Sequence, residues 1–139
     1  MPKPIAPAMG VAFAFPDVCQ TPAPPGPPVP IPYPNIAQLD QASGITDEGG
    51  KELLVGPAGL HVLLKDSEVA VSSGDEAGSV GGVKSGKIKG KCKIVQASSS
   101  VVYGPNKTGL ARFLDPTDQN EGNAQGMVLS AFPTVLVGD

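Results

Sequence analysis

The chain contains no tryptophan, and its 139 residues include only four phenylalanines and two tyrosines. A core built on large aromatic side chains is therefore excluded, and any core must consist mainly of Val, Leu, Ile and Ala. Such a chain suits a thin β-structure better than a thick globular one. The length is typical of one domain that buries a modest core.

Charged residues are also scarce, at 17% of the chain, with a formal net charge of −3 and a pI near 5.0. Nucleic-acid binding requires clustered Lys and Arg, so we expect no nucleic-acid partner and favour a protein partner. No apolar run approaches the 18 or so residues of a membrane-spanning helix, which predicts no stable membrane anchoring. Prolines interrupt the short apolar N-terminal run, and no cleavage site follows it, so we expect no signal peptide.

Cysteine and histidine are nearly absent, with two Cys and one His. Two cysteines are too few for a disulfide framework. Cys92 lies on the apolar face of a segment whose other face carries lysines. This position is typical of a small core side chain. His61 lies among apolar residues, which favours a partly buried imidazole whose hydrogen bonds are satisfied.

Catalysis has little support in the sequence. Cys19 lies between prolines and not at a helix N-terminus that would activate its thiol. The carboxylates that come closest to forming a pair lie in Gly-rich turns, where no motif selects them: Asp47, Glu48, Asp75 and Glu76. In a strand, the adjacent Asp75 and Glu76 would point to opposite faces. We therefore predict that the protein is not an enzyme and interpret these residues as turn formers.

Proline and glycine, by contrast, are plentiful, with 16 and 18 residues. Most of the prolines lie in residues 15–35, FPDVCQTPAPPGPPVPIPYPN, which we call the proline-rich strap. Proline fixes φ and lacks an N–H, so the strap is expected to be extended and to form neither a helix nor a central strand. One interpretation is a mobile linker or a polyproline II ligand. The alternative, favoured by the interleaved Val29, Ile31 and Tyr33, is a segment that packs against the fold.

The rest of the chain predicts an all-β fold with little helix. Runs of Val, Leu and Ile are separated by Gly at short intervals, as in domains built from short strands. The clearest predicted strand is 87–95, where four lysines alternate with Ile88, Gly90, Cys92 and Ile94. Its lysine face is either a docking stripe for an acidic partner or a solvated outer face. One helical turn is expected within 35–43, and turns are expected in the Gly-rich segment 72–86.

Three separated blocks, taken together, resemble one family. The strap with Pro30-Ile31-Pro32-Tyr33 (PIPY), the central SSGDEAGSVGGVKSGKIKGK and the late LARFLDPTDQNEGNAQG are similar to the PAAR-like domain described by its PIPY motif. The resemblance implies a small conical single-domain protein over residues 1–139, with the strap within 1–35 and a β-rich body over 45–139. Pro30, Ile31, Pro32 and Tyr33 are then signature residues of the strap and candidates for partner binding, with a structural role favoured.

The resemblance further implies a structural cap for the blunt end of a trimeric VgrG-type spike, one tip per trimer, in a type VI secretion system or a related contractile machine. The chain ends soon after the cap-like region, so we expect a stand-alone tip that binds an effector or adaptor rather than one fused to a toxin. Such a tip assembles in the cytoplasm and is delivered on contraction. The apolar segment 127–138 is either its docking base or an ordinary core strand.

Relatives of this kind hold a structural zinc ion near the apex through His and Cys side chains. Zinc prefers four N or S ligands, and this chain has at most three, namely His61, Cys19 and Cys92. Gln119 stands at the position where relatives carry a further His, and glutamine is a poor zinc ligand. We therefore predict no tightly bound zinc and no cofactor, with a degenerate zinc site at Cys19 and His61 as the alternative.

Two further functions stay open at this stage. One is a small β module that presents the strap as a polyproline II ligand to an aromatic groove. The other is an adaptor that loads a separate toxin, which is compatible with the cap.

Overall fold

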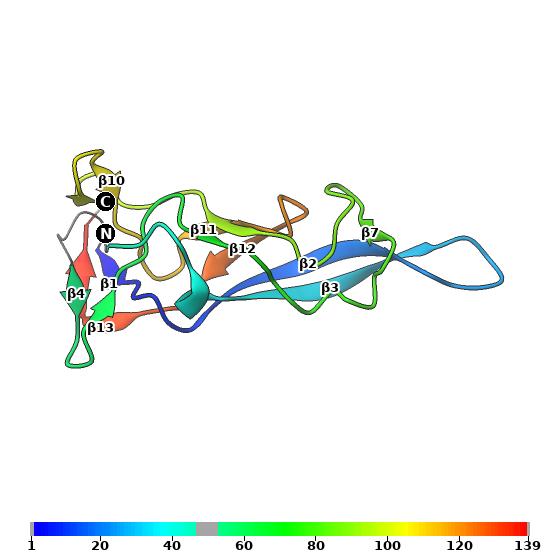
Figure 1. Ribbon diagram of the computed structural model, residues 1–139, viewed down its shortest axis with the longest axis horizontal. Helices are drawn as coiled ribbons and strands as arrows, with labels where there is room; N and C mark the ends of the chain where they lie inside the picture. Colours follow the sequence, from blue (N-terminus) through cyan, green and yellow to red (C-terminus); the bar gives the residue numbers. More distant parts are fainter. Residues whose placement is uncertain (1, 47–52, 139) are drawn as a thin grey trace.

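A computed structural model describes residues 2–46 and 53–138, and it shows an all-β single domain that tapers from a broad end to a narrow one (Figure 1). Asp47 and Glu48 lie outside the described residues. The described strands are β1 (Lys3–Ile5), β2 (Val11–Thr21), β3 (Val29–Gln38), β4 (Leu54–Val55), β5 (Leu60–His61), β6 (Glu68–Val69), β7 (Gly81–Gly82), β8 (Cys92–Ile94), β9 (Val102–Tyr103), β10 (Thr108–Gly109), β11 (Pro116–Gln119), β12 (Ala124–Val128) and β13 (Phe132–Val137).

The expected helical turn is present as a short 3-10 turn, η1 (Leu39–Gln41), which begins directly after β3. No helix in the described part of the chain is long and apolar enough to cross a membrane.

The largest sheet has seven strands, with β3-β2-β12-β11-β8-β6 in order and β7 paired to β2 beyond β12. The longest strand pair of this sheet is the antiparallel hairpin of β2 and β3, whose loop forms the narrow end (Figure 1). Both chain termini lie at the broad end, where three separate two-stranded sheets are found. The molecule therefore has two different ends joined by one hairpin.

The strap is extended, as predicted, but the prediction that it contains no central strand is wrong for its first part. Residues 15–21 belong to β2, which pairs with β3 on one side and with β12 and β7 on the other. Pro16 is tolerated because it lies in a bulge, where the register of β2 against β3 shifts between Ala14 and Asp17.

That bulge also decides which way β2 side chains point. Ala12 and Ala14 are buried, and strict alternation from them would turn Asp17 and Cys19 outward. The extra residue at the bulge reverses the alternation, so that Asp17 and Cys19 are fully buried instead. The narrow half thereby receives a carboxylate and a thiol in its interior.

The prediction of a continuous strand over 87–95 is also wrong, because only Cys92–Ile94 is a strand. Lys89 has a φ of 54°, which breaks the extended geometry. The two-faced pattern nevertheless holds, since Gly90, Cys92 and Ile94 are buried while the lysines are exposed. The alternation of residues predicted burial correctly, but it predicted a longer hydrogen-bonded strand than the structure contains.

Two aliphatic clusters form the core, and both lie away from the narrow end. The larger consists of buried residues, many of them on strands of the main sheet, and includes Cys92 in the role expected for it. The smaller joins the ribbons of the broad end, with Tyr103 and Phe132 partly buried against it. The larger cluster consists of Ala6, Ala12, Ala37, Leu39, Leu63, Val69, Cys92, Ile94, Ala111 and Val128, and the smaller of Ile5, Val55, Val62, Leu64, Leu110 and Val137.

Candidate functional site

The broad end is built from three two-stranded ribbons, β4–β5, β9–β10 and β1–β13. The first two are hairpins, and the third brings together the two ends of the chain. Each ribbon is followed by a short segment that turns into the core.

These three segments meet in a closed ring of backbone hydrogen bonds. The amide of Ala6 donates to the carbonyl of Ala111 (3.1 Å), Ala111 donates to Leu63 (2.9 Å), and Leu63 donates back to Ala6 (3.0 Å). All three residues are fully buried. Because each residue gives one bond and receives one from its neighbour, the ring has the pattern of a threefold axis.

A second set of three hydrogen bonds and a set of three bridges repeat the pattern. Two residues beyond each member of the ring, a backbone amide donates to a carbonyl of the neighbouring ribbon. These bonds run from Ala8 to His61 (2.7 Å), from Lys65 to Gly109 (2.9 Å) and from Phe113 to Pro4 (2.8 Å). Isolated β-bridges form a matching set of three: Ile5 with Arg112, Val62 with Pro7, and Leu110 with Leu64. One chain thus builds an end with approximate threefold symmetry.

We call the β4–β5 and β9–β10 hairpins, each with the segment that follows it, the two hairpin arms. The turns of these arms have the same backbone conformation at equivalent positions. Gly56 and Gly104 have φ values of 76° and 79°, and Asp66 and Leu114 both have a φ of 69°. In one arm the amide of Leu64 donates to Ser67 Oγ (2.9 Å), and in the other that of Arg112 donates to Asp115 Oδ2 (2.8 Å). Gly-Pro occurs in both turns, at 56–57 and 104–105, and this repeat is the sequence signal that our reading of the sequence missed.

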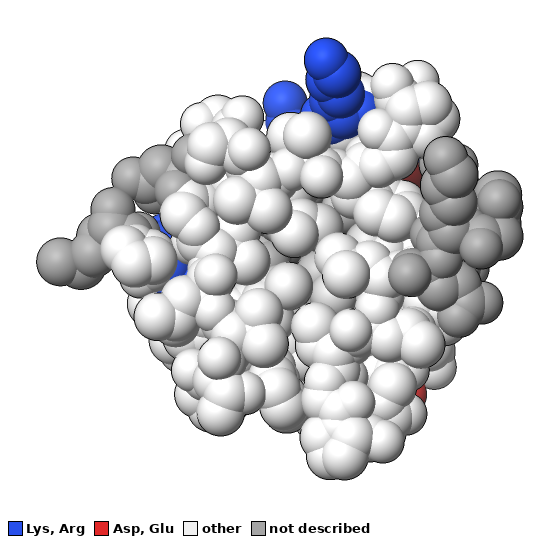
Figure 2. All heavy atoms as spheres, turned by 90° about the vertical axis from the view of Figure 1, so that its left-hand side faces the viewer, with Lys and Arg blue, Asp and Glu red and all other residues white. Residues whose placement is uncertain are grey.

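The outer strands of the three ribbons carry one exposed apolar side chain each at equivalent positions. Leu54 lies opposite His61, Val102 opposite Gly109, and Leu136 opposite Pro4. Their exposed fractions are 44%, 42% and 59%. Figure 2 looks onto this end and shows that its described residues expose few charged atoms, with basic atoms at the upper rim and left margin and acidic atoms at the right margin.

The segment 127–138 has both buried and exposed apolar side chains, which confirms its core-strand role, while its role as a docking base stays a prediction. Val128 and Val137 are buried in the two core clusters, whereas Leu136 points outward from the broad end. Alternation along β13 separates the two faces.

A second candidate site lies in the narrow half of the molecule, where the three family-like blocks converge. The ligand-type atoms of Asp17, Cys19 and Asp75 lie within 4.8 Å of one another, and all three residues are buried. We call these three residues, with Asn35, Ser72, Gln119, Asn120 and Asn123, the polar knot.

Amide groups surround Asp17. Its Oδ1 accepts hydrogen bonds from Asn120 Nδ2 (3.2 Å) and from Asn123 Nδ2, and its Oδ2 accepts one from Asn35 Nδ2 (3.1 Å). The Cys19 thiol also donates to Oδ1 (3.6 Å). Asp17 is therefore a buried carboxylate with donors on both oxygens.

Asp75 connects the central block to the knot. Its Oδ1 accepts from the backbone amide of Lys89 (3.0 Å), and its Oδ2 lies 3.5 Å from Asn35 Nδ2. Its carboxyl group is also hydrogen-bonded to that of Asp17. Asp75 is fully buried, so our interpretation of it as a simple turn former is wrong. The paired carboxylate comes from β2, far away in sequence, and not from the adjacent Glu76.

Gln119 joins the knot to the main sheet. Its Nε2 donates to Asn35 Oδ1 (2.7 Å) and to the Asn35 carbonyl (3.0 Å), and its Oε1 accepts from Thr117 Oγ1 (2.8 Å). Gln119 is thus a hydrogen-bond bridge between β11 and β3.

Burial and hydrogen bonding set the proton affinities in the knot. Burial acts to raise the pKa of Asp17, but hydrogen bonds from Asp75 and the three asparagines outweigh it and lower this pKa below 3.8. Burial, and then the hydrogen bond to Asp17, raise the pKa of Asp75 to about 7. Burial also raises the pKa of the Cys19 thiol to about 12, with the charge of Asp17 adding to it.

The structure does not bring the predicted metal candidates together. Cys19 lies in the knot, whereas the half-buried His61 lies on β5 at the broad end, the opposite side of the molecule from β7, with which Cys19 pairs (Figure 1). Cys92 belongs to the apolar core. The alternative of a degenerate zinc site at Cys19 and His61 is therefore wrong.

The PIPY residues lie on β3, paired with β2 from Pro30 opposite Gln20 to Tyr33 opposite Asp17. Pro30 and Pro32 are exposed, while Ile31 and Tyr33 are half-buried. The Tyr33 hydroxyl is hydrogen-bonded to Thr21 Oγ1 (2.7 Å) across the hairpin.

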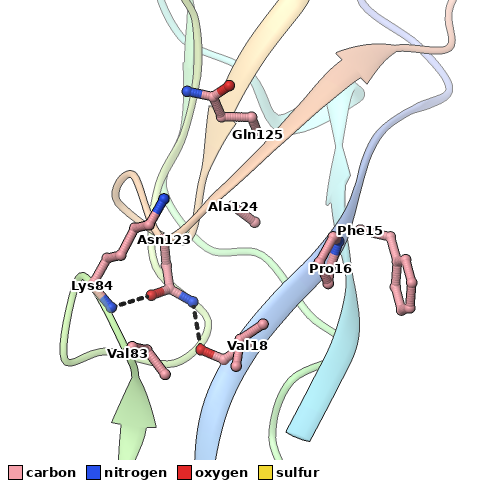
Figure 3. Close-up of a pocket in the computed structure, with 8 residues that line it drawn as sticks. All are labelled: Phe15, Pro16, Val18, Val83, Lys84, Asn123, Ala124 and Gln125. Atoms are coloured by element: carbon pink, nitrogen blue, oxygen red, sulfur yellow. Dashed lines mark hydrogen bonds between the residues drawn. The ribbon is translucent and has the colours of Figure 1, made fainter. Parts of the chain in front are cut away.

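An open cleft of about 510 Å³ lies beside the knot, between β2, the loop after β7 and the start of β12 (Figure 3). Phe15, Pro16 and Val83 contribute apolar walls. Asn123 closes its inner side, since its Oδ1 accepts from the Lys84 amide (2.7 Å) and its Nδ2 donates to the Val18 carbonyl (3.0 Å). Asn123 thus ties the β7 loop to β2.

Comparison with known proteins gave one result. No curated protein and no solved structure matched the chain significantly. One family model, described as the Toxin PAAR-like domain, matches residues 10–126, which include β2 to most of β12 and all the residues of the polar knot. The match covers well over half of the chain, so this protein belongs to the Toxin PAAR-like domain family.

Proposed function

We propose that this protein is a structural tip that caps the blunt end of a trimeric VgrG-type spike in a bacterial contractile injection system, such as a type VI secretion system. The observation that carries the proposal is the approximate threefold symmetry of the broad end. A single chain meets a trimer best when it offers each subunit an equivalent surface. Three equivalent ribbons give one tip per trimer.

The chemistry of the broad end supports the same partner. Leu54, Val102 and Leu136 are exposed at equivalent positions of the three ribbons, and the described residues of this end expose few charged atoms (Figure 2). Burying one such side chain contributes roughly 1.5–3 kcal/mol. Three of them arranged about one axis suit apolar contacts repeated three times on the end of a trimer.

The opposite end supports a piercing role. The hairpin loop over 22–28 carries five prolines at the narrow end, and it is continuous with the long strands β2 and β3. Proline reduces the conformational freedom of the chain, so this loop is stiff for its size. Such a tip would assemble in the cytoplasm and leave the cell with the spike, carrying an effector or an adaptor.

The other functions have less support. A polyproline II ligand needs a free extended backbone, but Val29 to Tyr33 are hydrogen-bonded partners of β2. Burial raises the pKa values of the Cys19 and Cys92 thiols to about 12, which disfavours either thiol as a nucleophile, and the absence of enzymatic activity stays a prediction.

The test is a binding measurement with a purified VgrG-type trimer. We expect a complex of one tip with three spike subunits by light scattering. Leu54→Asp, Val102→Asp and Leu136→Asp are each expected to weaken binding about tenfold or more, since each places a charge in an apolar contact.

Val71→Asp is the matched control, because Val71 is 54% exposed and lies after β6, outside the three ribbons. It is expected to bind like the parent chain. The proposal fails if the three ribbon variants bind as tightly as this control, or if two or three tips bind one trimer.

A further inference from the structure

Within the described residues, the polar knot occupies a part of the molecule that neither apolar cluster reaches. Both aliphatic clusters lie toward the broad end and the middle of the sheet. The knot instead joins five segments of the narrow half: β2, β3, the loop over 72–78, the segment 87–90 and the turn over 119–123. A narrow half this thin cannot bury large apolar side chains, so hydrogen bonds must hold it together.

The zinc ion that the resemblance to the PAAR-like domain implies does not fit the polar knot. Structural zinc sites are typically made of four Cys and His ligands, and the knot offers one Cys, no His and two carboxylates. N–H donors already meet the carboxylate oxygens, namely Asn120 and Asn123 on Asp17 Oδ1, Asn35 on Asp17 Oδ2, and the Lys89 amide on Asp75 Oδ1. Donors aimed at these oxygens occupy the positions that a cation would take.

The remaining polar atoms are also committed within the knot. The Cys19 sulfur carries its proton, which it donates to Asp17. The Gln119 oxygen accepts from Thr117, and Ser72 Oγ accepts from Asn35 (2.9 Å) and donates to the Gly90 carbonyl (2.7 Å). The ligand-type atoms of Asp17, Cys19 and Asp75 that come within 4.8 Å of one another therefore already have hydrogen-bond partners in the protein.

We propose that the narrow half is locked without a metal, by a proton shared between the buried carboxyl groups of Asp17 and Asp75 and by the amides of Asn35, Asn120 and Asn123. Two buried carboxylates whose oxygens lie within 4.8 Å of each other are not both ionised without a cation, so one of them keeps its proton. Asp75 donates that proton to Asp17, and the amides stabilise the single remaining charge.

The surrounding charges agree with this assignment. In the part of the chain that the structure describes, no Lys or Arg side chain forms an ion pair with Asp17 or Asp75. The neighbouring titratable groups are Cys19, which is protonated, and the exposed Glu76 and Lys89, while Lys87 is paired with Glu121. The shared proton is thus the local means of neutralising the second carboxyl.

The lock makes stability depend on pH with a definite sign. The pKa of Asp75 is higher in the folded than in the unfolded chain, so its stabilisation is complete below about 3.8 and is lost as pH rises through about 7. The lowered pKa of Asp17 acts in the opposite sense, and its stabilisation is lost as pH falls below 3.8. Between these limits, stability is expected to fall as pH rises.

Thermal unfolding of the full chain between about pH 4.5 and pH 8 tests the lock. The Tm of the parent chain should fall across this range. Asp75→Asn keeps a donor toward Asp17 and removes the titrating group, so its Tm should fall distinctly less. Glu76→Gln is the matched control in the same loop, and it should follow the parent chain.

Two measurements on the parent chain keep the proposal falsifiable if Asp75→Asn does not fold. Elemental analysis should find far less than one zinc per chain, and neither a chelator nor added zinc sulfate should shift the Tm. Infrared spectroscopy should show a protonated carboxyl band near neutral pH that disappears at higher pH. Zinc near one per chain, a Tm raised by zinc, or an Asp75→Asn profile identical to the parent profile overturns the lock. None of these readouts depends on spike binding, so the cap proposal can fail separately.

Discussion

At the scale of single residues, the two hairpin arms of the broad end use different side chains to accept the same backbone hydrogen bond in a turn. Ser67 accepts a hydrogen bond from the Leu64 amide with a neutral hydroxyl. Asp115 does the same for Arg112 and also pairs with its guanidinium, at 3.2 Å from Nε and 3.1 Å from Nη2. Arg112 and Asp115 are both buried, so one arm contains an ion pair where the other contains apolar packing.

Asp115→Ser should therefore keep the turn and lose the ion pair. We expect a loss of about 3 kcal/mol in the free energy of unfolding, because the Arg112 charge remains buried without its carboxylate. The measurement is chemical denaturation with circular dichroism.

The double variant Arg112→Leu/Asp115→Ser copies the Leu64–Ser67 arm and is the matched partner. It should recover to within about 1 kcal/mol of the parent chain. A double variant no more stable than Asp115→Ser would show that the two arms are not equivalent.

Residue identities alone predicted the buried role of Cys92 but not that of Asp75. Alternation with lysines reveals the burial of Cys92 from neighbouring residues. The partner of Asp75 is Asp17, and the two are brought together only by the fold of β2 and by its bulge. Local sequence carries no signal for such a pair.

At the scale of elements, the β2–β3 hairpin shows how a proline-rich segment becomes part of a sheet. Pro30, Pro32 and Pro34 alternate along β3, so their missing N–H groups all lie on the edge that faces away from β2. Val29, Ile31 and Tyr33 keep their amides for the hairpin. The exposed edge of β3 is thereby a poor template for another strand.

Replacing Pro30 and Pro32 together with Thr should restore two donors on that edge. We expect a folded protein that self-associates with rising concentration, measured by sedimentation velocity. Pro27→Thr/Pro28→Thr changes the hairpin loop outside the strands and should remain as monomeric as the parent chain. A folded Pro30→Thr/Pro32→Thr variant that stays monomeric at high concentration would argue against edge protection.

At the scale of the whole molecule, the broad end is a threefold arrangement in which one ribbon, β1–β13, joins the two ends of the chain. Val137 lies opposite Lys3 as Val55 lies opposite Leu60. A four-residue turn closes the β4–β5 ribbon, and a turn of the same kind should close the third ribbon.

A circular permutant tests this equivalence. The old ends are joined after Val137 by Gly-Pro-Ala-Gly, copied from 56–59, and the chain is opened between Asn106 and Lys107 in the β9–β10 turn. We expect the same β-rich circular dichroism spectrum, cooperative unfolding and unchanged stoichiometry with a spike trimer. A permutant opened within the buried ring, between Ala111 and Arg112, should not fold. If both permutants fold equally well, the ring is not the organising centre of the broad end.

The sequence by itself determined the composition of the core, the all-β class, the extended strap and the likeness to the PAAR-like domain family, because these depend on local propensity, alternation and short motifs. Tertiary structure alone decided the threefold rings, the exposed set of Leu54, Val102 and Leu136, and the carboxyl pair of Asp17 and Asp75. Each of these joins residues far apart in the chain, through register, a bulge and chain closure. In the described residues neither apolar cluster reaches the thin narrow half, and only the folded chain shows that a polar knot stands in its place.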